Sequence, residues 1–214
     1  SGHGNLLFAL NYRHDLPPDA IFAEFRRWNA LHARDLVPAH PYHDLDRTPN
    51  RRLRLGYVSP DFRQHAAAHF ALPLLIAHDR AQVEVFCYAE VAMPDATTAR
   101  FQAIADHWRP TTGLTDAEVA ELIRRDRIDV VIDMAGHTGG NRLLALARRP
   151  APVQIESLLG LGTTTGMDAM DAFLADPILA PPGTEAVFAE RLIRLPRIPL
   201  VYEPPEGMPD VGPP

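Results

Sequence analysis

The sequence predicts an α/β domain with a doubly wound, mainly parallel, Rossmann-like sheet. From Leu53 onward, short apolar or β-branched runs alternate with helix-like segments, the pattern of a parallel sheet. The run Val83–Tyr88 is almost continuously apolar, as a strand covered on both faces requires. The 214 residues, 46% hydrophobic and 22% charged, suffice for one well-buried domain with a small extension.

A helical segment is expected ahead of the sheet. Pro17-Pro18-Asp19 opens it, and the apolar side chains of Ile21, Phe25, Trp28 and Leu31 then recur at helical spacing. The polar, proline-rich stretch 37–50 is expected to be a connection, and 203–214, with five prolines and two glycines, an interdomain linker. The expected plan is a helical entry segment and linker at 1–50, a Rossmann-like domain at 51–202 and a proline-rich linker at 203–214.

The remaining elements follow in order along the chain. Strands are expected at 53–58, 83–88, 107–109, 129–134, 153–158, 173–175 and 192–195. Helices are expected at 70–77, 97–105, 115–125 and 142–148. The helix at 115–125 is the clearest, because Thr115 is followed three residues later by Glu118, which is a capping-box pattern.

Composition excludes several classes of function. The formal net charge is −6, so no nucleic-acid surface is expected. Cys87 is the single cysteine, which rules out a disulfide within the chain and favours a buried thiol in a reducing, cytoplasmic compartment. No apolar run reaches the roughly 18 residues of a membrane span, and the N-terminus does not resemble a signal peptide.

The first candidate site is the loop 59–70, which follows the first strand of the domain. Ligands of parallel sheets bind beyond the carboxyl ends of the strands, where the following helix presents free N–H groups. His65 and His69 lie in this loop, so either could act as a general base or contact a phosphate. Their spacing of four would place both on one helical face, as zinc ligands can be, but no third ligand is apparent. The alternative is that both are surface or capping residues.

Two later loops are also rich in small residues. The loop 135–142 has three glycines together with Thr138 and Asn141, and could cradle an anion or a sugar. The alternative is a strand–helix turn capped by Asn141. The loop 159–166 carries Gly160, Gly162 and Gly166, but its spacing and late position do not fit a dinucleotide fingerprint.

Several stretches together resemble one known family. They are LRLGYVSPDF at 53–62, His65 through Phe70, VEVFCY at 83–88, DHWR at 106–109, IDMAGHTGGNRL at 132–143, RPAPVQ at 149–154, AMD at 169–171 and Asp176-Pro177. They resemble the catalytic region of the O-linked N-acetylglucosamine transferase (SPINDLY-like) family. NLLFALNY at 5–12 is similar to the segment that joins the family's tetratricopeptide repeats to its catalytic part.

The resemblance implies the N-terminal lobe of a two-lobed GT-B glycosyltransferase. This family transfers N-acetylglucosamine from UDP-GlcNAc to Ser or Thr of acceptor proteins with inversion, using neither a metal nor another cofactor. The C-terminal lobe, which supplies most uridine and diphosphate contacts, would begin just past the linker at 203–214. The lobe alone is therefore expected to be inactive, and its uncovered strand-end edge makes self-association an expectation.

Site residues are carried over by the same resemblance. His69, ahead of His65, is the candidate base or phosphate contact, while His137, Thr138 and the loop Gly162-Thr163-Thr164 match segments that line the family's cleft. The chain departs from the family at 66–68, where three alanines replace the usual proline and glycine, and at 155–166, where aromatics and a proline are lost. The alternative functions are a diverged, non-catalytic binding or regulatory module and an unrelated Rossmann-like enzyme.

Overall fold

The computed structural model describes residues 2–38, 46–157, 159, 162–204 and 207. Its centre is a seven-stranded sheet with the order β3-β2-β1-β4-β5-β6-β7, in which every neighbouring pair is parallel. The strands are β1 Leu53–Ser59, β2 Val83–Ala89, β3 His107–Pro110, β4 Val130–Asp133, β5 Val153–Glu156, β6 Ala172–Ala175 and β7 Arg191–Arg194. The predicted fold class is therefore confirmed, with all seven strands in their expected places.

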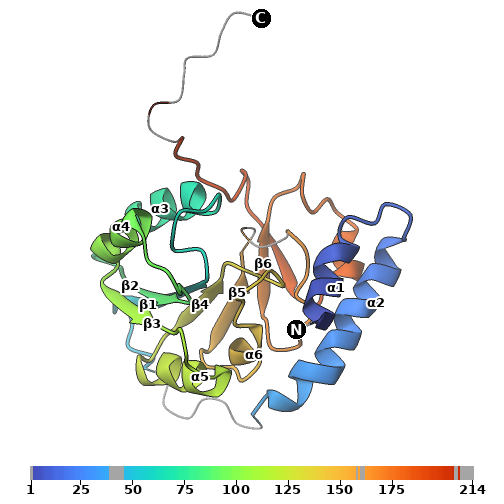
Figure 1. Cartoon of the computed structure of the whole chain (residues 1–214), viewed down its shortest axis with the longest axis horizontal. Helices are drawn as coiled ribbons and strands as arrows, with labels where there is room; N and C mark the ends of the chain where they lie inside the picture. The colour runs from blue at the N-terminus through green and yellow to red at the C-terminus, as the bar shows by residue number, and fades with distance from the viewer. Residues whose placement is uncertain (1, 39–45, 158, 160–161, 205–206, 208–214) are drawn as a thin grey trace, which may run out of the picture.

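Helices lie on both sides of the sheet (Figure 1). They are α1 Gly2–Leu10, α2 Pro18–Trp28, α3 Ala68–Ile76, α4 Ala96–Ile104, α5 Asp116–Arg125 and α6 Leu143–Leu146. A π-helical turn (Asn29–Ala33) and two 3-10 turns (Arg34–Leu36 and Thr184–Val187) complete the described helical segments. No helix in the described ranges has the length and apolar character needed to cross a membrane.

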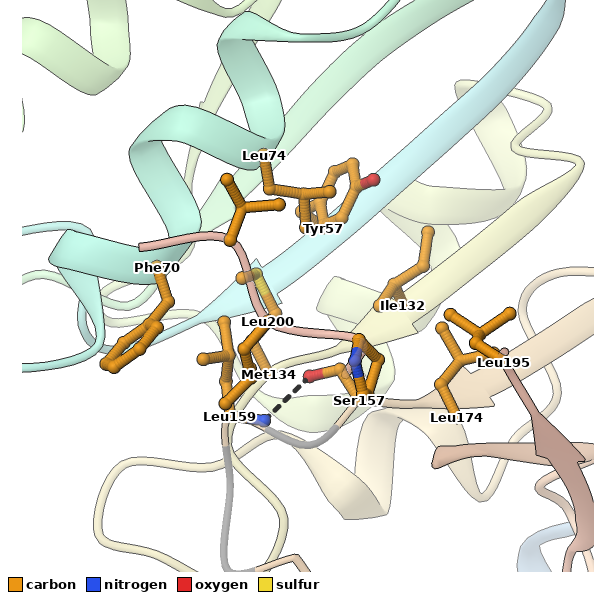
Figure 2. Close-up of a pocket in the computed structure, with 12 residues that line it drawn as sticks. Tyr57, Phe70, Leu74, Ile132, Met134, Ser157, Leu159, Leu174, Leu195 and Leu200 are labelled. Carbon is orange, nitrogen blue, oxygen red and sulfur yellow. Dashed lines mark hydrogen bonds between the residues drawn. The ribbon is translucent and has the colours of Figure 1, made fainter. Parts of the chain in front are cut away.

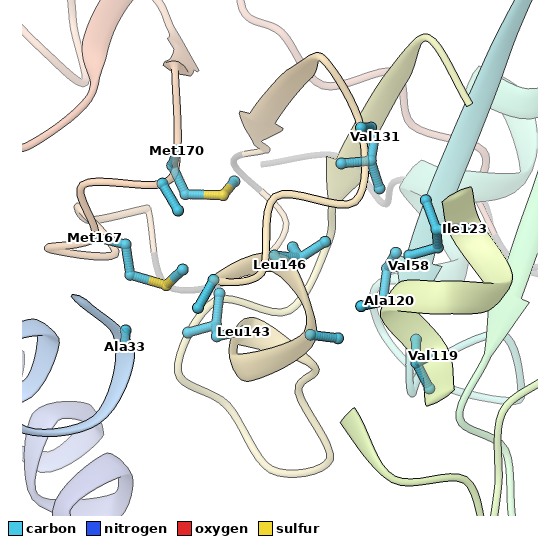
Figure 3. Packing of buried hydrophobic residues seen from close by; sticks show 14 of the residues in the cluster. Ala33, Val58, Val119, Ala120, Ile123, Val131, Leu143, Leu146, Met167 and Met170 are labelled. Carbon is cyan, nitrogen blue, oxygen red and sulfur yellow. The ribbon is translucent and has the colours of Figure 1, made fainter. Parts of the chain in front are cut away.

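Two hydrophobic clusters cover the opposite faces of the sheet. Successive side chains of a strand point to opposite faces, so Tyr57 belongs to the cluster that contains α3, whereas Val58 belongs to the other. Figure 3 shows the second cluster, in which side chains of α6 lie between those of α5 and the methionines Met167 and Met170 that follow β5. Phe25 and Trp28 of α2 are buried in this same cluster, so the N-terminal helices pack directly onto the sheet domain.

Local signals account for some of the helix boundaries. Thr115 caps α5 as predicted, with its hydroxyl accepting from the Glu118 N–H and the Glu118 carboxylate accepting from the Thr115 N–H. The helix α1 was not predicted as such, because its sequence carries little amphipathic pattern and only Gly4 and Leu7 are buried. The helix α6 has four residues rather than the seven expected.

Candidate functional site

An apolar cavity of about 160 Å³ lies on the α3 side of the sheet (Figure 2). Its walls come from the strands, from α3 and from the segment that follows β7; the lining residues are Tyr57, Phe70, Leu74, Ile132, Met134, Ser157, Leu159, Leu174, Leu195, Pro199, Leu200 and Val201. The chain after β7 thus lies against the sheet and α3. We call residues 199–203 the exit segment.

His69 lies in the first turn of α3, next to this cavity. Its Nδ1 is 3.1 Å from the Glu203 carbonyl oxygen, and its own carbonyl accepts the Glu203 N–H at 2.8 Å. The Tyr202 ring packs against both the imidazole and the neighbouring Phe70 ring. His69 is partly buried and lies beyond the carboxyl end of β1, where the sequence places it.

His65 lies outside the helix, which corrects one expectation. Because α3 begins at Ala68, His65 and His69 do not share a helical face. The His65 side chain is exposed; its Nδ1 accepts the Ala67 N–H at 3.2 Å and lies 3.6 Å from a carboxylate oxygen of Asp61. Within the described residues no three His, Cys, Asp or Glu side chains form a group suited to a metal ion.

His137 lies in a different environment. Its imidazole is 4% exposed, packs edge-on against Phe25 and Trp28, and donates from Nε2 to the Thr165 carbonyl at 2.8 Å. Burial lowers the pKa of His137 to about 4, so the ring is neutral near pH 7. The structure brings His137 to the loop that ends at Gly166, but on the α2 side of the sheet rather than beside His69.

The remaining predicted site residues lie in the loops 135–142 and 159–166. Thr138 donates its hydroxyl to the Ala135 carbonyl at 2.7 Å. Thr164 is buried and donates to Glu190 at 2.6 Å, while Thr163 is partly exposed. Gly162 has a φ of +68°, a conformation that glycine adopts readily. Gly160 falls outside the described residues.

The N-cap position of α6 is Arg142, which makes no side-chain cap hydrogen bond, and not Asn141 as the alternative for this loop held. Asn141 Oδ1 accepts the Leu143 N–H at 3.3 Å, and its amide group donates to the Thr138 carbonyl at 2.6 Å. Asn141 therefore stabilises this strand–helix turn from the position just before the N-cap.

Sequence reasoning missed a pair of buried acids at the same edge. Asp133 ends β4 and Glu156 ends β5; they are paired in register and are 0% and 1% exposed. Asp133 Oδ2 accepts the Gly136 N–H at 2.6 Å, but burial still raises the pKa of Asp133. Burial and the Asp133 carboxylate raise the pKa of Glu156 well above its usual range. The raised pKa favours the protonated form of Glu156 in the folded state. The sequence signal for this pair was an acidic residue at the end of each of two neighbouring strands.

Comparison with known proteins identifies the relatives of this fold. The model of the family described as Glycosyl transferase family 41 matches residues 25–203. A tomato (Solanum lycopersicum) protein named probable UDP-N-acetylglucosamine–peptide N-acetylglucosaminyltransferase SPINDLY is 34% identical over 98% of this chain. A Caenorhabditis elegans UDP-N-acetylglucosamine–peptide N-acetylglucosaminyltransferase is 36% identical over 68% of it.

A solved structure agrees with these sequence matches. A mutant of the Thermobaculum terrenum O-GlcNAc transferase superimposes with a TM-score of 0.93, at 44% sequence identity over 99% of this chain. The chain spans 40% of that protein, 22% of the tomato relative and 13% of the nematode relative. On the family match, the sequence identity and the shared fold together, this chain belongs to glycosyl transferase family 41.

Proposed function

We propose that this chain is the N-terminal lobe of a GT-B glycosyltransferase that transfers N-acetylglucosamine from UDP-GlcNAc to Ser or Thr of proteins, with inversion. The observation that carries the proposal is the match of 99% of this chain to part of an O-GlcNAc transferase at a TM-score of 0.93. The chain spans 40% of that protein. In this proposal a second lobe completes the donor site, and this lobe alone is inactive. The division into an entry segment (1–50), a lobe (51–202) and an interlobe linker (203–214) belongs to this proposal.

In this proposal His69 is the residue that takes the acceptor proton or contacts the donor phosphate, and His65 is its alternate. Support comes from their position at the carboxyl end of β1, beside the N-terminus of α3, where an anion is favoured. Thr138 and the loop Gly162-Thr163-Thr164 line the sugar or acceptor side. His137 orients this loop through the Thr165 carbonyl. No cofactor enters the reaction.

A chimera tests the proposal directly. This chain would replace the matched segment of the Thermobaculum terrenum enzyme, and transfer of N-acetylglucosamine to an acceptor peptide would be measured by mass spectrometry. We expect transfer by the chimera, and its loss with His69→Ala. Retention in that variant with loss in His65→Ala would move the catalytic role to His65.

A second candidate function is a non-catalytic binding or regulatory module. It is favoured by the altered stretch 155–166 and by the buried acid Glu156 within it. A folded chimera that binds UDP-GlcNAc in calorimetry and yet transfers no sugar would support this candidate and refute the transferase. Tight UDP-GlcNAc binding by the isolated chain would instead contradict the need for a second lobe.

A further inference from the structure

A proline inside α3 leaves one backbone carbonyl without its helical partner. In an α-helix the carbonyl of residue 69 would accept from the N–H of residue 73. Residue 73 is Pro73, which has no N–H, so the His69 carbonyl must find another donor. This requirement arises at the residue that is proposed as the catalytic base.

The exit segment supplies that donor. The Glu203 N–H donates to the His69 carbonyl at 2.8 Å, and the Glu203 carbonyl lies 3.1 Å from His69 Nδ1. The same residue therefore contacts both the backbone and the side chain of His69. Tyr202 adds a ring contact to the imidazole, although its side chain is 53% exposed.

A carbonyl oxygen can only accept, so this contact determines the state of the imidazole. His69 Nδ1 must carry a proton to donate to Glu203, and in the neutral ring Nε2 then has the free lone pair. Within the described part of the chain Nε2 makes no hydrogen bond. A histidine whose Nδ1–H is held by an oriented acceptor presents Nε2 as a base, which is the arrangement that general-base catalysis uses.

We propose that Glu203, acting through its backbone and assisted by Tyr202, is the positioning residue for His69. It holds the imidazole in the Nδ1–H tautomer and aims Nε2 as the proton acceptor. This inference rests on the proposed function for its catalytic meaning. The orientation of the His69 imidazole therefore depends on the position of the exit segment. Displacing this segment from α3 removes the Glu203 contact and frees the imidazole.

The side chain of Glu203 makes neither of the two contacts to His69, so removing it provides a matched control. Its carboxylate pairs with Arg100 at 3.3 Å, and both groups are about half exposed, so this pair contributes little. Glu203→Ala removes the carboxylate and retains the N–H. Glu203→Pro removes the N–H, so that neither residue 203 nor Pro73 can satisfy the His69 carbonyl.

The tautomer of His69 is measured in the 214-residue chain by long-range proton–nitrogen correlation of the imidazole ring. We expect the Nδ1–H form to predominate in the wild type and in Glu203→Ala, and to become the minority form in Glu203→Pro. A wild type with mainly the Nε2–H form, or a Glu203→Pro variant that keeps the Nδ1–H form, overturns the inference. This readout requires neither donor nor acceptor, so it fails independently of the proposed function.

A second variant keeps the inference testable if Glu203→Pro does not fold. Pro73→Ala restores the helical N–H, which then competes with Glu203 for the His69 carbonyl. We expect several-fold faster hydrogen exchange at the Glu203 amide and a smaller Nδ1–H population at His69. Unchanged exchange and an unchanged tautomer in a folded Pro73→Ala variant would refute the role of Glu203.

Discussion

Replacing Gly166 by alanine tests how the candidate loop is anchored to the N-terminal helices. Gly166 has a φ of +73°, and an added Cβ would lie 2.7 Å from the backbone carbon, the backbone oxygen and the Cβ of Phe25. Left-handed backbone costs a residue with a side chain roughly 1–2 kcal/mol. Forcing extra volume into a packed interior costs about 1–3 kcal/mol more. We expect Gly166→Ala to lower the free energy of unfolding by about 2–5 kcal/mol.

The matched control is Gly113→Ala. Gly113 also has positive φ, at +84°, but an added Cβ there would meet nothing within 4 Å. Its cost is therefore the backbone part alone, about 1–2 kcal/mol. Both free energies are obtained from urea unfolding curves extrapolated to water. Equal destabilisation by the two substitutions would refute the claim that Gly166 is needed because α2 approaches it so closely.

Three further predictions concern titrating groups. The raised pKa of Glu156 means that the folded state holds a proton which the unfolded chain releases, so wild-type stability falls as pH rises above about 4.3. Glu156→Gln should flatten this slope in urea unfolding, and an unchanged slope would contradict the raised pKa of Glu156. His137 should titrate by NMR with a midpoint near its lowered pKa of about 4. Its contribution to stability is therefore fully present above about pH 6.5 and declines as the pH falls toward that midpoint. A midpoint in the ordinary range for histidine would contradict the burial of this imidazole. The buried Cys87 thiol, whose pKa is raised to about 12, should react with thiol reagents only on unfolding; rapid labelling of the native chain would refute this.

Much of the fold could be predicted from the sequence because its signals are local. The run Val83–Tyr88 became β2, and Thr115 with Glu118 became the cap of α5. The placement of His65 and His69 at the ligand edge also follows from local order, since a loop after a parallel strand has only one edge to occupy. Their separation by the start of α3 at Ala68 was not evident, because no strong N-cap residue marks that boundary.

The candidate site was harder to predict, since its contacts join distant parts of the chain. The sequence places His137 in a loop, where exposure would be expected. It is buried because α2 packs over it, with Phe25 and Trp28 in contact with the imidazole. The buried pair at 133 and 156 depends on strand register, which places the two acids side by side only when β4 and β5 pair. An acid at the end of each strand is visible in the sequence, but the contact between the two acids is not, and the burial of His137 has no local signal.

Local sequence patterns were enough to predict the parallel α/β class, the order of strands and helices, and the edge of the sheet at which His69 lies. Apolar periodicities and caps act over a few residues, and the chain carries them without reference to its distant parts. The groups that contact His69 could not be predicted from these patterns, because they depend on how the folded chain packs. The Glu203 carbonyl reaches it across 134 positions of sequence, because Pro73 leaves the His69 carbonyl free and the chain returns over α3 after β7 to satisfy it. That meeting depends on packing and on unsatisfied backbone groups, which a linear sequence does not display.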